Sequence, residues 1–264
     1  MQLTPQIIEK LVKSLPHNEA AELLAMFDEL EERKVVQAAQ DDFLAFIAAV
    51  DRSYKFGAHL KRLGNLLMDV EQNIKNRIAV SMAPRMGKSQ MISIYYPAWY
   101  LGRHPDHKVI VASHTADLAV VMARKVRNLI NTPEYRQIFP GTAIASDAKA
   151  AAQWNTTKGG EYFAIGVGGT VTGKGADLLI IDDPHSEQEA ALAASDPSVY
   201  DKVFEWYSSG PRQRLQPGGS IIIVMTRWGK RDLTGRILQG VVEKDGEDWE
   251  VIDFPAILPS GNPL

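Results

Sequence analysis

The stretch of sequence that decides the fold reads Ile78-Ala79-Val80-Ser81-Met82-Ala83-Pro84-Arg85-Met86-Gly87-Lys88-Ser89. Its first residues are apolar and favour a buried strand, and its last three residues end a Walker A phosphate-binding loop. The usual first glycine of that motif falls at Met82, so the pattern is half met. A helix-like stretch, Gln90–Tyr100, follows directly. This strand–loop–helix context favours a phosphate-binding loop over a surface turn.

The residue types of the loop predict its chemistry. Backbone N–H groups from Arg85 to Ser89 can surround a β-phosphate at the positive N-terminus of a helix. Gly87 lets the backbone approach closely, because it has no Cβ. We expect Lys88 to reach the β- and γ-phosphates and the Ser89 hydroxyl to ligate Mg²⁺. Arg85 places a second cation in the loop, able to contact the γ-phosphate or to sense its loss.

A second stretch carries two acids at the end of an apolar strand and reads Asp177-Leu178-Leu179-Ile180-Ile181-Asp182-Asp183-Pro184. Asp182 fits a Walker B aspartate, which holds Mg²⁺ directly or through water. Asp183 stands where many ATPases place a glutamate that activates water, with Glu187 as the nearest alternative. Adjacent strand residues point to opposite faces, so Asp182 is expected to face the metal and Asp183 the far side of the γ-phosphate. An Asp-Asp-Pro turn alone would be the commoner explanation, but together the two motifs indicate a P-loop ATPase.

A third apolar run, Ile221–Met225, ends in Thr226-Arg227-Trp228. A hydroxyl and a guanidinium at the end of a strand beside the γ-phosphate suit a sensor that relays hydrolysis to a moving part. We therefore assign a coupling role to Thr226 and Arg227.

The wider pattern predicts an α/β fold. Continuous apolar runs, which suit strands buried on both faces, alternate with helix-like stretches, as in a doubly wound, mostly parallel sheet with helices on both faces. Residues 1–50 are predicted to form a helical N-terminal segment, with Thr4 and Asn18 as helix caps. The predicted strands are 78–80, 109–111, 162–167, 178–181, 221–225 and 250–254, and the predicted helices between them are 89–101, 115–131, 196–209 and 231–243.

Composition limits the function classes. The chain has 264 residues, 45% of them hydrophobic and 23% charged, as in an ordinary globular protein. It contains no cysteine, which excludes disulfides, cysteine zinc sites and thiol catalysis. No apolar run is long enough to span a membrane. The net charge is −3, so any contact with nucleic acid must use a local basic patch.

These motifs, in this order, resemble one family: the large terminase subunit of tailed bacteriophages, the motor that packages double-stranded DNA. The resemblance spans roughly residues 40–258. Besides the phosphate loop and the two strand ends, the stretches that carry it are 42–43, 57–60, 97–103, 154–156, 168–177 and 232–233.

The resemblance implies a RecA-like P-loop fold of the additional-strand, conserved-acid (ASCE) type in residues 51–258, hydrolysis of ATP with Mg²⁺, and DNA translocation into a procapsid. It maps the Walker A lysine on Lys88, the Walker B aspartate on Asp182, the catalytic acid on Asp183 and the coupling motif on Thr226. The trans-acting cation of some relatives maps on the loop that contains Lys174. The implied nucleotide-binding residues are Pro84, Arg85, Met86, Gly87, Lys88, Ser89 and Gln90, with Tyr54 and His59 near the adenine; Lys88 and Arg85 are expected to assist Asp183 in catalysis.

The resemblance also implies partners and a place of action. The expected partners are double-stranded DNA, the portal protein of the procapsid, the small terminase subunit and a C-terminal nuclease domain of the full-length chain. Residues 259–264 are expected to begin the linker to that domain, so we expect no nuclease activity from this chain. It is expected to be a monomer in isolation and a homo-oligomeric ring when docked, in the cytoplasm of the infected bacterium. A helicase-like translocase and a nucleotide-gated assembly module with little turnover are the alternatives.

Overall fold

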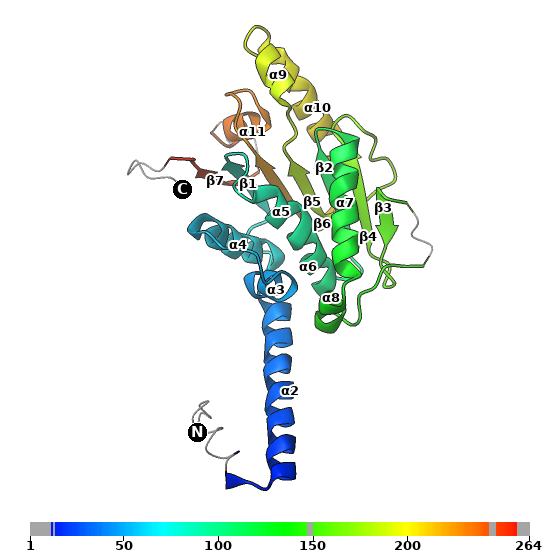
Figure 1. The fold of residues 1–264 in the computed structure, drawn as a ribbon. Helices are drawn as coiled ribbons and strands as arrows, with labels where there is room; N and C mark the ends of the chain where they lie inside the picture. The colour runs from blue at the N-terminus through cyan, green and yellow to red at the C-terminus, as the bar shows by residue number, and fades with distance from the viewer. Residues whose placement is uncertain (1–11, 13, 147–149, 243–246, 258–264) are drawn as a thin grey trace.

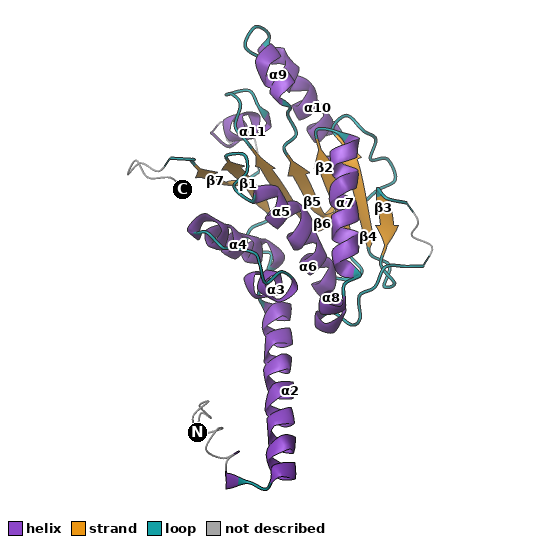
Figure 2. Cartoon of the chain, in the orientation of Figure 1, coloured by secondary structure: helices purple, strands orange, loops and turns teal. Residues whose placement is uncertain are grey.

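A computed structural model describes residues 12, 14–146, 150–242 and 247–257. Within these residues the chain forms a seven-stranded sheet in the order β3-β4-β2-β5-β6-β1-β7, with helices packed on it (Figures 1 and 2). All neighbouring strands are parallel except β3 and β4. The strands are β1 (Arg77–Met82), β2 (Lys108–Ser113), β3 (Gln153–Asn155), β4 (Glu161–Gly166), β5 (Ala176–Asp182), β6 (Leu215–Met225) and β7 (Glu250–Phe254).

The six predicted strands are confirmed, and the reason is burial on both faces. Along β5, Leu178 and Ile180 pack into one hydrophobic cluster, whereas Leu179 and Ile181 pack into a second. The same alternation divides β1, β2 and β6 between the two clusters. Strand β3 was not predicted, because it is a short antiparallel edge strand of three residues that pairs only with β4.

The helices cover both faces of the sheet (Figure 2). The predicted helices after β1, β2 and β6 are confirmed, and the one predicted at 196–209 begins with a 3₁₀ turn at Pro197–Tyr200. Three helices were not predicted: α4, α8 and α9. The helices described are α2 (His17–Asp41), α3 (Phe43–Val50), α4 (Ala58–Glu71), α5 (Lys88–Gln90), α6 (Tyr96–Arg103), α7 (Ala116–Ile130), α8 (Pro133–Ile138), α9 (Glu187–Leu192), α10 (Asp201–Ser209) and α11 (Leu233–Val242), with a π-helical turn, Met91–Tyr95, between α5 and α6.

The N-terminal segment is helical where it is described. Helix α2 begins at His17 with Pro16 at its N-cap, so the prediction that Asn18 caps this helix is wrong. Asn18 lies inside the first turn instead, because Pro16 supplies the extended backbone that precedes a helix. The predicted cap at Thr4 lies outside the described residues, as do most of the helix after it and the linker at 259–264. Among the described residues, none of the helices combines the length and hydropathy that a bilayer span requires.

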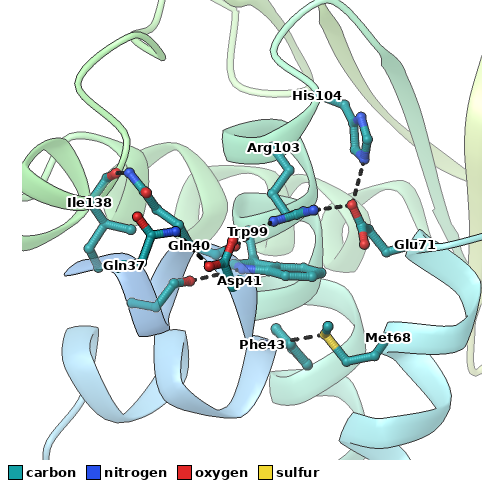
Figure 3. Close-up of polar contacts among 11 residues, drawn as sticks. Gln37, Gln40, Asp41, Phe43, Met68, Glu71, Trp99, Arg103, His104 and Ile138 are labelled. Carbon is teal, nitrogen blue, oxygen red and sulfur yellow. Dashed lines mark hydrogen bonds and ion pairs between the residues drawn. The ribbon is translucent and has the colours of Figure 1, made fainter. Parts of the chain in front are cut away.

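Helix α2 extends away from the body of the protein, and its last turn is anchored on α6 (Figures 1 and 3). Arg103 Nη1 donates to the Gln40 carbonyl at 2.8 Å, and Trp99 Nε1 donates to the Ala39 carbonyl at 3.1 Å. Arg103 Nε in turn pairs with the buried Glu71 at 2.6 Å. These bonds satisfy carbonyl groups that the end of α2 leaves without helical partners. The helical stretch that starts at Lys88 thus holds the N-terminal segment at its other end.

Candidate functional site

The loop between β1 and α5 has the backbone of a phosphate-binding turn. Gly87 has φ +87° and Arg85 has φ +62°, both in the left-handed region. A Cβ at Gly87 would lie 3.3 Å from the Leu60 side chain and 3.5 Å from the Tyr54 hydroxyl, so both the backbone conformation and the close packing favour glycine. The loop lies at the carboxyl end of β1, which is the edge of a parallel sheet where ligands bind.

Lys88 joins the ends of three strands. It is 5% exposed, and its Nζ lies 2.9 Å from Asp183 Oδ2 at the end of β5. The same Nζ donates to Thr226 Oγ1, which follows β6, at 2.9 Å, and to the carbonyl of Met82 in β1 at 3.5 Å. The lysine, the predicted catalytic acid and the predicted coupling residue therefore form one contact cluster.

Asp182 is fully buried at the end of β5. Its Oδ1 accepts from the Ser89 hydroxyl at 3.0 Å, and its Oδ2 accepts from the Ser93 hydroxyl at 2.7 Å. Burial, followed by the charge of Asp183, raises the pKa of Asp182 to about 7, although both serines and Lys88 oppose the shift. The expected metal-binding carboxylate therefore lies beside the expected hydroxyl ligand and is costly to ionise without a cation.

This raised pKa predicts a pH-dependent stability. An unfolded chain ionises Asp182 near pH 3.8, whereas the folded chain retains the proton until about pH 7, so the free energy of unfolding should fall as pH rises through this window. A shift of this size corresponds to as much as about 4 kcal/mol. Urea unfolding at pH 5 and pH 8 checks this, with Asp182→Asn, which has no proton to lose, as the control. An equal pH dependence in both proteins would contradict it.

Asp183 departs from strand geometry. Its φ is +43°, its N–H donates to the Val224 carbonyl at 2.9 Å, and its Oδ1 accepts from the Thr226 N–H at 2.9 Å. The prediction that Asp182 and Asp183 point to opposite faces is therefore wrong. Strand β5 ends at Asp182, and the left-handed turn at Asp183 brings both carboxylates against the start of the phosphate-loop helix.

Arg227 has a partner that the sequence did not suggest. Its Nε lies 3.0 Å from Oδ2 of Asp232, which is fully buried and also accepts from the N–H groups of Trp228, Gly229 and Gly235. The guanidinium therefore stabilises the loop after β6. Thr226 and Trp228 line the phosphate cleft, and Arg227 is not among its lining residues.

The phosphate cleft encloses about 970 Å³ above the loop. His185, which burial keeps neutral by lowering its pKa, accepts from the Leu233 N–H at 3.0 Å and ties the turn after β5 to α11. Glu187, the alternative catalytic acid, lies in the cleft wall at the start of α9. The cleft is lined by Pro84, Arg85, Gly87, Lys88, Ser89, Gln90, His114, Thr115, Asp183, His185, Ser186, Glu187, Gln188, Glu189, Thr226 and Trp228.

The remaining predicted residues lie around this cleft or away from it. His59 Nε2 is 3.2 Å from the Met86 carbonyl, and the Tyr54 ring packs edge-on against Tyr95, so both lie behind the phosphate loop. Lys174 forms an ion pair with Glu161 and lies over the Phe163 ring, 5.0 Å from its centroid. Because Glu161 begins β4, Lys174 lies at the sheet edge opposite the phosphate loop.

Sequence reasoning missed several residues of the site. Ser93 follows Ser89 by one helical turn, and this spacing could have identified it. His114 and Thr115 directly follow β2, so the rule that ligands bind at the carboxyl ends of parallel strands could have identified them. Asp232 gave no local signal, since its partners are set by the loop that folds around it.

The fold and the site together define a P-loop NTPase with an additional strand, because β6 lies between the phosphate-loop strand β1 and the acid-bearing strand β5. The sequence profile of the terminase large subunit, T4likevirus-type, N-terminal region, matches residues 80–213, just over half of the chain. The chain belongs to this family of large terminase subunits. No protein of curated function matches it in sequence.

Solved structures of similar fold come from bacteriophages. The large terminase of bacteriophage HK97 has a TM-score of 0.48 and 16% identity, with 81% of this chain and 43% of that chain covered. For a variant of the Thermus phage P74-26 large terminase ATPase domain, the corresponding values are 0.45, 15%, 76% and 86%. For the large terminase of a thermophilic bacteriophage in complex with ADP, they are 0.44, 12%, 71% and 44%. The chain thus spans less than half the length of the HK97 protein and of the ADP-bound terminase.

Proposed function

We propose that this chain is the ATP-hydrolysing motor region of a DNA-packaging terminase, which couples hydrolysis of Mg-ATP to translocation of double-stranded DNA into a procapsid. The observation that carries the proposal is the meeting of Lys88, Asp182 and Asp183 at one sheet edge. Lys88 Nζ lies 2.9 Å from Asp183 Oδ2, and the next residue, Ser89, donates to Asp182 at 3.0 Å. A phosphate-binding cation, a metal-binding acid and a candidate base are the groups that phosphoryl transfer to water requires.

The residues present fit Mg²⁺. Mg²⁺ prefers oxygen ligands, retains several waters, and binds through one or two protein groups together with substrate phosphates. Ser89 and Asp182 supply such groups, and the buried Asp182 carboxylate gains a counter-charge. Within the described residues no group of three or more His, Asp or Glu could hold a metal, so the phosphates of the nucleotide would have to complete the site. Mg²⁺ bound there would neutralise charge on the β- and γ-phosphate oxygens.

The protein groups have separate tasks in this proposal. Lys88 exchanges its partners Asp183 and Thr226 for phosphate oxygens when ATP enters the cleft. Asp183, released from the lysine, accepts a proton from the attacking water. Thr226 touches both Lys88 and Asp183, so it receives any displacement of either group and passes it to the loop before α11. Arg85, exposed at the mouth of the cleft, is placed to meet the γ-phosphate.

The partners follow from family membership and are part of the proposal. They are double-stranded DNA, the portal protein, the small terminase subunit and a nuclease domain of a longer chain. The isolated chain is expected to be a monomer with weak ATPase activity, and a ring forms when it docks on the procapsid in the cytoplasm of the infected bacterium.

Steady-state ATP hydrolysis, measured with and without DNA and procapsid, tests the proposal. A packaging motor should hydrolyse ATP weakly alone and fastest with procapsid and DNA together. Full stimulation by DNA alone would indicate a helicase-like translocase instead. Nucleotide binding without turnover under all conditions would indicate an assembly module. Asp183→Asn protein serves as the control for contaminating ATPase.

Lys174 is the candidate for a cation that completes the site of a neighbouring subunit. Such cations raise turnover about 10³–10⁵-fold in other systems. To act in trans, Lys174 must exchange its partner Glu161 for a phosphate of the neighbour, so Lys174→Ala should abolish packaging and leave the nucleotide affinity of the isolated chain unchanged. Packaging assays with this variant, alone and mixed with Lys88→Ala protein, check the assignment. Normal packaging by Lys174→Ala protein alone would eliminate this candidate.

A further inference from the structure

The helix that follows the phosphate loop is not a regular α-helix throughout. Its first turn is α5, but residues Met91–Tyr95 form a π-helical turn before α6 begins. Such turns are rare and are found mostly at functional sites. Ser93 lies in the middle of this turn and is fully buried.

The Ser93 hydroxyl is committed to one partner, the carboxylate of Asp182. It donates to Oδ2 at 2.7 Å, while the Ser89 hydroxyl donates to Oδ1 at 3.0 Å. The two oxygens of the carboxylate are thus held from two successive turns of one helix. A carboxylate held at both oxygens cannot rotate about its Cβ–Cγ bond without breaking one of these bonds.

We propose that Ser93 is a positioning residue for the metal-binding carboxylate: it holds Oδ2 of Asp182 so that Oδ1 stays turned toward Ser89, where the cation binds. This inference rests on the proposed function. Ser93 touches neither nucleotide nor metal in this proposal and acts only through Asp182. Groups that orient metal ligands in this way change metal affinity by about 10–100-fold when they are removed.

The π-helical turn supplies a physical reason for the placement. Ser93 follows Ser89 by four residues, so both hydroxyls lie on the same side of the helix and face β5. The inserted residue costs a regular hydrogen-bond ladder in a buried helix, and the structure gains a second donor to a buried charge.

The experiment compares Ser93→Ala with the parent chain in two measurements. The first is the affinity for ADP in the presence of EDTA, which reports the phosphate loop without metal. The second is the affinity of the ADP complex for Mn²⁺, followed by the EPR signal of free Mn²⁺. We expect the first to stay within about twofold of the parent and the second to weaken by about 10–100-fold. The matched control is Ser81→Ala, which removes a buried hydroxyl that has no hydrogen-bond partner within the described part of the chain.

The outcomes separate this inference from the proposed function. A parent chain that binds neither ADP nor Mn²⁺ overturns the proposed function and this inference with it. A parent that binds both, with Mn²⁺ affinity unchanged in Ser93→Ala, overturns the role of Ser93 alone. Equal losses of ADP and Mn²⁺ affinity would mean that Ser93 merely supports the fold, which also overturns it. Ser93→Thr retains the hydroxyl and should recover most of the Mn²⁺ affinity.

Discussion

Lys88→Ala should abolish ATP hydrolysis, with turnover falling by about 10³-fold or more, the scale of loss when a cation that stabilises a transferred phosphoryl group is removed. The Lys88 ammonium is 5% exposed and lies at the carboxyl ends of β1, β5 and β6, so no other side chain can replace it from the same position. Nucleotide affinity should fall as well, because the charge that faces the β- and γ-phosphates is lost. Turnover and binding of a fluorescent ADP analogue measure the two effects.

The fold should survive this change. Asp183, the ion-pair partner of Lys88, is about one-third exposed and retains the Thr226 N–H as a donor, so water can solvate the carboxylate left behind. Thermal unfolding of Lys88→Ala should therefore resemble that of Lys125→Ala, which removes an exposed lysine of α7. Parent-like turnover by a folded Lys88→Ala protein would refute the assignment of the phosphate loop.

Asp183→Asn should reduce turnover by about 10²–10⁴-fold, the usual contribution of general-base catalysis. Asparagine keeps the shape of the side chain, tolerates the left-handed backbone at φ +43°, and can still accept from the Thr226 N–H. It cannot take a proton from water. Loss of the negative charge beside Lys88 should also tighten nucleotide binding, since the phosphates then face no competitor for the lysine. Rapid-quench turnover and equilibrium nucleotide binding check both effects.

Two further variants separate the roles of the neighbouring acids. Asp182→Asn should raise the Mg²⁺ concentration needed for half-maximal activity, because its carboxylate faces Ser89 and Ser93. Glu187→Gln should have little effect, since Glu187 lies in the cleft wall at the start of α9, whereas Asp183 is the acid that pairs with Lys88. If Asp183→Asn hydrolyses ATP at the parent rate while Glu187→Gln does not, Glu187 is the catalytic acid.

Local patterns were sufficient for the sheet and for part of the site. Six apolar runs predicted six strands because strands buried on both faces need an apolar residue at every position, and this requirement is visible in any short window of sequence. The phosphate loop and the acids after Ile181 were found for a similar reason: each motif lies within a few residues of a strand end. The short strand β3 and the helices α4, α8 and α9 carry weaker local signals and were missed.

The sequence by itself determined which residues lie at the carboxyl ends of the strands, and hence that Lys88 and the two aspartates belong to one site. Only the tertiary structure decided how those groups face one another. Lys88 meets Thr226 across 138 residues of chain, and Ser93 meets Asp182 across 89. The left-handed turn at Asp183 and the capture of Arg227 by Asp232 depend on the same packing. Contacts of this kind form only after β6 has inserted between β1 and β5, so no short stretch of sequence contains the information that fixes them.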